Sequence, residues 1–334
     1  MLAGLVDVTT EWAYRIPFAL QWMWPAFLIP VLCFAPESPW HLVRKGRLEE
    51  AEKNLNRLVR KSAGIDTKQT LAMIVHTNNL EQDLETGTSY KDCFKGPELR
   101  RTEIACVVFA GQVLSGSSFA YNSTYFFEQV GLPTKTTYNL NVGGTGMALV
   151  GTLISWFLLM PYFGRRIIYV TGMFTMAAIL ATIGILNVKT SVHGVGMSQA
   201  VLTLLWTFTF QLSVGQLGWA LPAEMGSTRL RQKTICLARN SYYVVSVISQ
   251  CIQPYFMNPT ELNLKGYTGF IWGATALIAA IWAFFRLPET KGRTFEDLDL
   301  LFAKKIPARQ FKRYEVDVYN ETETAKVATG VSVV

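Results

Sequence analysis

Seven long apolar stretches alternate with polar segments along the chain. They lie near residues 16–35, 104–127, 138–160, 167–187, 198–221, 234–257 and 267–287. A bilayer has a hydrocarbon core about 30 Å thick, which a helix of roughly 20 mostly apolar residues can cross. Several stretches contain proline, glycine or polar residues, which membrane helices tolerate where a neighbouring helix or a wet cavity satisfies the freed polar groups. The pattern therefore predicts an all-α membrane protein with about seven transmembrane helices.

The polar segment between the first two apolar stretches has a helical pattern of its own. Ser38 can cap a helix that begins at Pro39. Asp66 and Gln69 have the spacing of a capping box for a further helix that runs to about Leu84. We expect short amphipathic helices in this segment.

Composition and charge agree with a membrane protein and orient it. Half of the 334 residues are hydrophobic and 16% are charged; the mean hydropathy is +0.22. If the chain leaves the first span for the cytoplasm at Pro36, 26 of the 31 lysines and arginines face the cytoplasm and four face the other side. This bias predicts that residues 36–103 and the C-terminal tail are cytoplasmic. The net charge of +7 then reflects topology and attraction to membrane lipid, so we expect no nucleic-acid partner.

A short sequence motif that occurs twice in the chain indicates how the spans are grouped. Pro36-Glu37-Ser38 follows the first span, and Pro288-Glu289-Thr290 follows the seventh, so six spans lie between the two marks. Some transporters are built from two six-helix halves related by an axis along the membrane normal. We expect four parts: the end of the N-terminal half with its last helix (1–35), a cytoplasmic linker (36–103), the six-helix C-terminal half (104–287) and a cytoplasmic tail (288–334).

Five motifs in these segments resemble those of the sugar porters of the major facilitator superfamily, in particular the fungal maltose and other α-glucoside permeases. They are Pro36-Glu37-Ser38-Pro39 with Gly46-Arg47, Gln112-x-x-Ser115-Gly116, Gly164-Arg165-Arg166, Trp219 to Glu224 with Arg231, and Pro288-Glu289-Thr290-Lys291-Gly292-Arg293-Thr294. The chain departs from the family pattern at Val113, where the family has a second Gln, and at Pro161, where it has an Asp.

The resemblance implies a major facilitator fold cut to its last seven helices. It also implies proton-coupled uptake of α-glucosides such as maltose across the plasma membrane. Full-length members need both halves, and the first half commonly supplies the acidic residue of proton coupling, so we expect the chain not to transport alone. Two alternatives stay open: a transporter-like sugar receptor that binds without transporting, and a non-functional truncated remnant.

The resemblance and the polarity of the spans together indicate a sugar site near the middle of the membrane. The resemblance implies Gln112, Ser118 and Trp219 as sugar ligands. Four more candidates come from polarity and depth alone: Tyr121, Asn122, Gln216 and Asn240. Amides, hydroxyls and indole suit a sugar, because its hydroxyls both donate and accept hydrogen bonds. For the second group an interhelical hydrogen bond is an equally good explanation.

Charged residues of the motifs are expected to form a latch at the cytoplasmic mouth. The set is Glu37, Arg165, Arg166, Glu224, Arg229, Arg231, Glu289 and Arg293. We expect Glu37 to pair with Arg231 or Arg165, and Glu224 and Glu289 to engage arginines of the same set. Exposed ion pairs contribute only about 0 to 1 kcal/mol, so they can break when the mouth opens. The alternative is that these charges only cap helix ends and set the topology.

Other residue patterns indicate no further chemistry. The five cysteines and three histidines lack metal-ligand spacing. We find no nucleophile-and-base set and no phosphate-binding glycine loop, so we expect no enzyme activity, no metal and no cofactor. The expected partners are a small sugar, a proton and membrane lipid. The sequence does not specify an oligomeric state.

Overall fold

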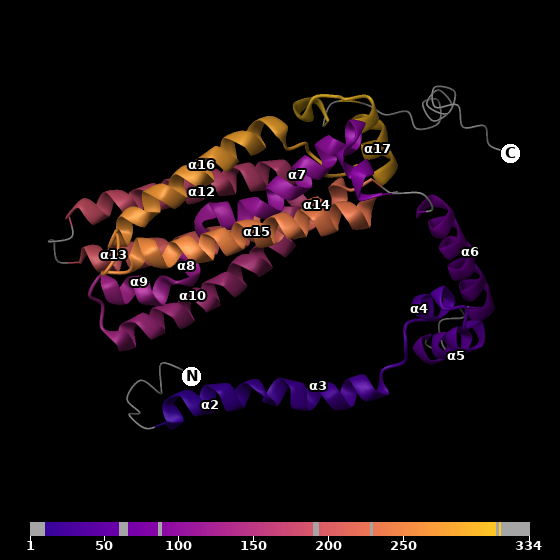
Figure 1. Ribbon diagram of the computed structural model, residues 1–334, viewed down its shortest axis with the longest axis horizontal. Helices are drawn as coiled ribbons and strands as arrows, with labels where there is room; N and C mark the ends of the chain where they lie inside the picture. Colours follow the sequence, from indigo (N-terminus) through magenta and orange to yellow (C-terminus); the bar gives the residue numbers. More distant parts are fainter. Residues whose placement is uncertain are drawn as a thin grey trace. The chain divides into compact units, whose positions relative to one another are not determined.

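The computed structural model describes residues 11–59, 66–85, 89–189, 194–227, 230–311 and 314. Every regular element in these ranges is a helix (Figure 1). The chain divides into two compact units, Met1–Ser89 and Tyr90–Val334. The predicted all-α fold is confirmed.

The first unit contains one long apolar helical stretch and three further helices. The helices are α2 (Trp12–Gln21), α3 (Met23–Phe34), α4 (Pro39–Arg44), α5 (Leu48–Leu58) and α6 (Thr67–Glu85). No side chain of α3 is buried, as expected of an apolar span whose surroundings are lipid or other protein. The last three helices pack around a small apolar cluster formed by Leu42, Val43, Ala51 and Ile74.

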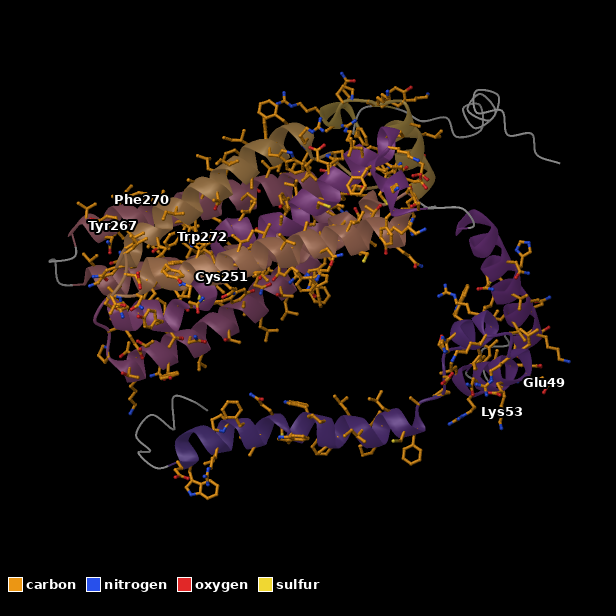
Figure 2. The ribbon with its side chains drawn as sticks, in the orientation of Figure 1. Glu49, Lys53, Cys251, Tyr267, Phe270 and Trp272 are labelled. Carbon is orange, nitrogen blue, oxygen red and sulfur yellow. The ribbon has the colours of Figure 1, made fainter. Side chains whose placement is uncertain are left out.

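Two predictions for helix starts in this unit have different outcomes. The helix at Pro39 begins where expected, but the Ser38 side chain accepts no capping hydrogen bond, so that part of the prediction is wrong. Asp66 does cap α6, because its Oδ1 accepts a hydrogen bond from the Lys68 backbone N–H at 2.9 Å. The exposed face of α5 carries Glu49 and Lys53 (Figure 2).

The second unit is a bundle of six long helical stretches. Its elements are η2 (Tyr90–Phe94), α7 (Gly96–Gln112), η3 (Val113–Ser117), α8 (Ser118–Tyr121), α9 (Ser123–Gln129), α10 (Thr134–Ile154), η4 (Ser155–Leu159), α11 (Met160–Tyr162), α12 (Arg165–Leu186), η5 (Asn187–Lys189), α13 (Val195–Leu212), α14 (Val214–Met225), α15 (Arg231–Met257), η6 (Lys265–Tyr267), α16 (Thr268–Arg286), α17 (Phe295–Ala303) and η7 (Ala308–Gln310). In Figure 1 the long helices run side by side, with α17 at one end of the bundle.

The bundle is organised around α7 and α12. The first packs against α14 and α15, the second packs against α13 and α16, and α10 lies against α13. Trp272 on α16 donates from its indole to Gln253 Oε1 on α15 at 2.8 Å, at the end of the bundle where Figure 2 places Tyr267, Phe270 and Cys251. This bond pairs two buried polar groups across α15 and α16, which offsets part of the cost of burying them.

Six helical stretches of the described chain are long and apolar enough to cross a membrane. They are Arg15–Phe34, Gly96–Tyr121, Thr134–Tyr162, Arg165–Leu186, Val195–Met225 and Lys265–Arg286. The seventh predicted span, 234–257, falls within α15, which is 27 residues long but is not among these six. This helix carries Arg239, Asn240 and several glutamines, so its average hydropathy is lower than that of its neighbours.

Two of the long stretches are broken in the middle. The turn of η3 is a π-helix, and within it Gly116 has a φ of 95°, a left-handed conformation that favours glycine. Between α13 and α14, Ser213 leaves the helical region with φ −127° and ψ −88°. Broken helices at membrane depth are tolerated where the irregular backbone is buried in protein or lines a cavity.

Candidate functional site

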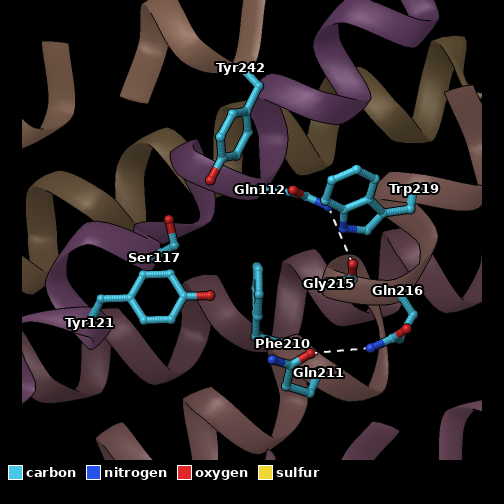
Figure 3. Close-up of a pocket in the computed structure, with 9 residues that line it drawn as sticks. All are labelled: Gln112, Ser117, Tyr121, Phe210, Gln211, Gly215, Gln216, Trp219 and Tyr242. Atoms are coloured by element: carbon cyan, nitrogen blue, oxygen red, sulfur yellow. Dashed lines mark hydrogen bonds between the residues drawn. The ribbon is translucent and has the colours of Figure 1, made fainter. Parts of the chain in front are cut away.

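A polar cavity of about 210 Å³ lies beside these two helix breaks (Figure 3). Helices α7, α8, α13, α14 and α15 and the turn η3 contribute to its wall. The lining residues are Gln112, Ser117, Tyr121, Phe210, Gln211, Gly215, Gln216, Trp219 and Tyr242. Three glutamine amides and two phenol hydroxyls therefore face the same space as the aromatic faces of Trp219 and Phe210.

Gln112 is held at the cavity wall by a close approach between α7 and α14. Its side chain is 6% exposed, and its Nε2 donates to the Gly215 carbonyl oxygen at 3.3 Å. A Cβ atom on Gly218 would lie 1.8 Å from the same Nε2, so only a glycine there leaves room for the amide. The amide is thereby fixed in position before any ligand arrives.

A second set of hydrogen bonds orients Gln216. Its Nε2 donates to Gln211 Oε1 at 3.3 Å and to Thr152 Oγ1 at 3.2 Å, and its Oε1 accepts from the Trp156 indole at 3.1 Å. The bond between the two glutamines is drawn in Figure 3. These contacts link α10, α13 and α14 through side chains rather than backbone.

Arg239 lies beside the cavity within a group of aromatic rings. Its guanidinium is 4.3 Å from the Trp219 ring centroid, 4.6 Å from that of Tyr242, 4.9 Å from that of Tyr243 and 5.5 Å from that of Phe109. Each cation–π contact is worth about 0.5 to 2 kcal/mol, depending on desolvation. The rings therefore stabilise a charge at a depth where charges are costly. Two of the rings also line the cavity, so Arg239 supports its wall.

Four of the seven predicted sugar ligands lie together in this cavity, and three do not. Gln112, Tyr121, Gln216 and Trp219 line it. Ser118 is buried and its Oγ accepts a hydrogen bond from Ser249 Oγ of α15 at 2.6 Å, while the Asn122 amide donates to the Ser118 carbonyl at 2.7 Å. Asn240 is exposed and makes a long 3.9 Å contact to the Cys236 sulfur. These last three face other surfaces of their helices.

Five lining residues were missed by sequence reasoning. They are Ser117, Phe210, Gln211, Gly215 and Tyr242. A usable signal was present for Gln211, which lies in the same apolar stretch as Gln216 and is one of its few strongly polar residues. Arg239 carried a signal too, because tyrosines three and four residues later share its helix face.

The charged residues of the motifs gather where α12, α14 and the segment after α16 meet. Arg165 Nε lies 3.5 Å from Glu224 Oε1, and both side chains are 26% exposed. The other oxygen of Glu224 accepts a hydrogen bond from Thr290 Oγ1 at 2.5 Å. Glu289 is 8% exposed and accepts from the Arg165 backbone N–H at 2.8 Å, so it caps the start of α12.

The other arginines of the expected latch have different contacts. Arg166 donates to the Phe284 carbonyl at 2.7 Å, and Arg293 donates to the carbonyls of Phe311 and Tyr314. Arg231 lies 3.9 Å from the centroid of the Phe295 ring. Arg229 lies outside the described residues. Glu37 belongs to the first unit, where its carbonyl accepts from Asn54, and its pairing with an arginine of the second unit stays a prediction.

Arg101 is a buried cation that none of the sequence motifs indicated. It is 2% exposed, lies 2.6 Å from Asp299 Oδ1 and donates to the carbonyls of Met225 and Leu298 at 3.2 and 3.1 Å. Its guanidinium also lies 4.4 Å from the Phe302 ring centroid. One side chain of α7 thus contacts both the last residue of α14 and three residues of α17.

Comparison with known proteins supports a transporter. The model of a family described as sugar (and other) transporter matches residues 2–302. A maltose permease of Saccharomyces cerevisiae is 36% identical over 327 residues, which are 96% of this chain and 53% of the permease. An alpha-glucosides permease of the same yeast is 35% identical over 325 residues, covering 95% of this chain and 53% of that protein. The chain spans about half the length of these permeases.

Solved structures show the same fold. The proton:xylose symporter XylE, of the major facilitator superfamily, bound to 6-bromo-6-deoxy-D-glucose, superposes with a TM-score of 0.65 at 19% identity, covering 90% of this chain and 62% of that one. The inward open conformation of XylE from E. coli gives a TM-score of 0.62 at 21% identity, covering 89% and 60%. At this identity the likeness concerns the fold alone, and it confirms the major facilitator architecture.

The resemblance inferred from the five motifs is therefore confirmed. The relatives are permeases and transporters, not enzymes. A family match over most of the chain agrees with the helical bundle, its apolar spans and its polar cavity. The chain belongs to the sugar transporter family of the major facilitator superfamily.

Proposed function

We propose that this protein is a proton-coupled permease that takes up α-glucosides such as maltose, and that the sugar binds in the cavity lined by Gln112, Gln216 and Trp219. The observation that carries the proposal is the lining itself. It combines amides that both donate and accept with aromatic faces that pack against the C–H face of a sugar ring. The names of the relatives supply the substrate class, and the name of XylE supplies the proton.

The group that binds the coupling proton is not expected among the residues that line this cavity. None of the nine residues that line the cavity is acidic, so a carboxylate that exchanges the proton has to come from outside this cavity. In transporters of this architecture one half rocks against the other around a central site. We propose that the proton-coupling group lies on the N-terminal half, which faces the C-terminal half across the central site in transporters of this architecture.

The charged cluster of Arg165, Glu224 and Glu289 is proposed as the cytoplasmic latch. The ion pair is partly wetted, so its net contribution is about 0 to 1 kcal/mol, small enough to break in each cycle. The bond from Thr290 to Glu224 ties the segment after the last span to the same pair. We further propose a plasma-membrane location with residues 36–103 and the C-terminal tail in the cytoplasm, following the lysine and arginine bias.

The test is labelled maltose binding and uptake in yeast cells that lack their own maltose permeases. We expect saturable maltose binding to membranes that contain the chain, and any uptake to rise when the outside medium is acidified. Membranes of cells with an empty vector are the control. Binding no greater than in the control would overturn the proposal. Saturable binding without uptake agrees both with a chain that does not transport alone and with the receptor alternative.

A further inference from the structure

A second polar cavity, of about 280 Å³, adjoins the first. It is lined by residues of α8, α10, α13 and the first residue of α9. Its lining residues are Ala120, Tyr121, Ser123, Asn141, Gly144, Thr145, Ala148, Thr203, Leu204, Thr207 and Gln211. Tyr121 and Gln211 line both cavities, so the two spaces are neighbours at these side chains. Figure 3 shows Tyr121 and Gln211 on the same side of the first cavity.

The polar residues of the second cavity form two facing stripes. Asn141 and Thr145 are four residues apart on α10, and Thr203, Thr207 and Gln211 follow at the same spacing on α13. Residues four apart lie on one face of a helix. The lining contains no charged side chain and alternates the polar groups with small or apolar ones, so it suits a neutral, hydroxyl-rich ligand better than an ion or a lipid chain.

The hydroxyl groups of Thr145 and Thr207 in these stripes are available to accept hydrogen bonds from a ligand. Thr145 Oγ1 donates to the Asn141 carbonyl at 3.1 Å, and Thr207 Oγ1 donates to the Thr203 carbonyl at 3.0 Å. Each hydroxyl hydrogen is thus used within its own helix, and the oxygen lone pairs remain for a donor in the cavity. The hydroxyl groups of a sugar are such donors.

The size of the two cavities agrees with two parts of one site. Small-molecule sites usually measure about 300 to 1,000 Å³; neither cavity alone reaches that range, but the two volumes taken together do. A ligand of two rings would place one ring in each cavity and the bond between them beside Tyr121 and Gln211.

We propose that the second cavity is the subsite for the second sugar ring of an α-glucoside. Thr207 and Thr145 accept hydrogen bonds from hydroxyls of this ring, and they make the protein prefer a disaccharide to a monosaccharide. This inference rests on the proposed function, because it assumes that the first ring occupies the cavity of Gln112 and Trp219.

The test compares labelled maltose with labelled methyl α-D-glucoside, which has one ring, in binding to membranes that contain the full 334-residue chain. For Thr207→Val and Thr145→Val we expect maltose binding to weaken by roughly 2- to 10-fold each, the effect of one hydrogen bond, with binding of the one-ring sugar unchanged. Retained binding of the one-ring sugar shows that the variants are folded.

Thr209→Val is the matched control. Thr209 lies on the same helix as Thr207, is half-buried like it and donates to the Leu205 carbonyl at 2.9 Å, but it lines neither cavity. We expect the Thr209→Val protein to bind both sugars with the affinity of the unaltered protein. By contrast, Gln112→Ala should weaken binding of both sugars.

The outcomes separate the two proposals. If the unaltered chain binds neither sugar, the proposed function is wrong and the subsite is wrong with it. If it binds both sugars equally, or if Thr207→Val and Thr145→Val weaken both sugars alike or neither, the subsite is wrong while the proposed function stands.

Discussion

At the scale of single residues, space around one glycine decides how α12 begins. A Cβ atom on Gly164 would lie 2.0 Å from Glu289 Oε2, so the carboxylate that caps the helix occupies the place of a side chain. Gly164 has a φ of −73°, which any residue adopts, so the requirement comes from packing and not from backbone conformation.

This contact yields a prediction for Gly164→Ala. The methyl group should displace Glu289 from the first turn of α12, leave its carboxylate half-buried without the Arg165 N–H, and destabilise the protein by about 1 to 3 kcal/mol. Gly143→Ala on α10 is the control, because nothing lies within 4 Å of its added Cβ. Thermal unfolding in detergent measures both, and equal melting temperatures for the two variants would contradict the prediction.

A second residue-scale prediction concerns Arg239. Replacement by Lys keeps the charge but loses the flat guanidinium that contacts four rings, so Trp219 and Tyr242 should be held less firmly at the cavity. We expect maltose binding to weaken about 5-fold or more, equivalent to about 1 kcal/mol of cation–π energy. Lys265→Arg, the opposite exchange at a site away from the cavity, should leave binding unchanged. Unaltered maltose affinity in Arg239→Lys would show that the rings hold their places without the guanidinium.

At the scale of helices, the ends of α12 and α14 are joined by an ion pair that the proposed latch requires to break and reform. Glu224→Gln should slow transport, or the exchange of bound sugar, by several-fold while leaving the amount of protein in the membrane unchanged. The reason is that the pair contributes only about 0 to 1 kcal/mol to stability and acts mainly on the balance between open and closed states. A double exchange, Arg165→Glu with Glu224→Arg, should restore part of the rate. Unchanged rates in Glu224→Gln would leave the alternative that the charges only cap helices.

The docking of α17 on α7 depends on Arg101 in a different way. Because this guanidinium is almost fully buried, replacing it removes its ion pair with the partly exposed Asp299 and its hydrogen bonds to the carbonyls of Met225 and Leu298. A lost hydrogen bond to a charged group costs about 1.5 to 3 kcal/mol. Arg101→Met should therefore release α17 and expose the C-terminal segment to limited proteolysis. Arg47→Met is the control, since Arg47 pairs with Glu50 on an exposed surface. Equal cleavage rates in the two variants would contradict the role of Arg101.

At the scale of the whole molecule, the proposed topology is open to labelling. With Cys33, Cys106, Cys236 and Cys251 changed to Ser, a membrane-impermeant maleimide should label Lys53→Cys only after cells are permeabilised, and Glu261→Cys in intact cells. Cys93 can stay, because it is buried and burial raises the pKa of its thiol, which lowers the reactive thiolate at neutral pH. Labelling of Lys53→Cys in intact cells would overturn the orientation.

The sequence by itself determined the features that depend on local pattern. The length and hydropathy of each apolar stretch place the spans, since a bilayer demands about 20 apolar residues per crossing. Turn and loop motifs such as Pro288-Glu289-Thr290 indicated the family, because they occur at fixed points between the spans. Gln112 and Trp219 were found through those motifs, and Tyr121 and Gln216 through their polarity at membrane depth.

The tertiary structure alone decided which side chains share a space. Ser118 is as polar as its neighbour Ser117, yet one faces Ser249 on α15 and the other faces the cavity. The rotation of each helix face depends on the breaks at Gly116 and Ser213, and a one-residue change in the position of a break turns a face by about 100°, since a helix has 3.6 residues per turn. Two of the four rings around Arg239, those of Phe109 and Trp219, come from the other helices α7 and α14. Hydropathy indicates which stretches of the chain cross the membrane. The packing of the helices determines the direction in which each side chain points.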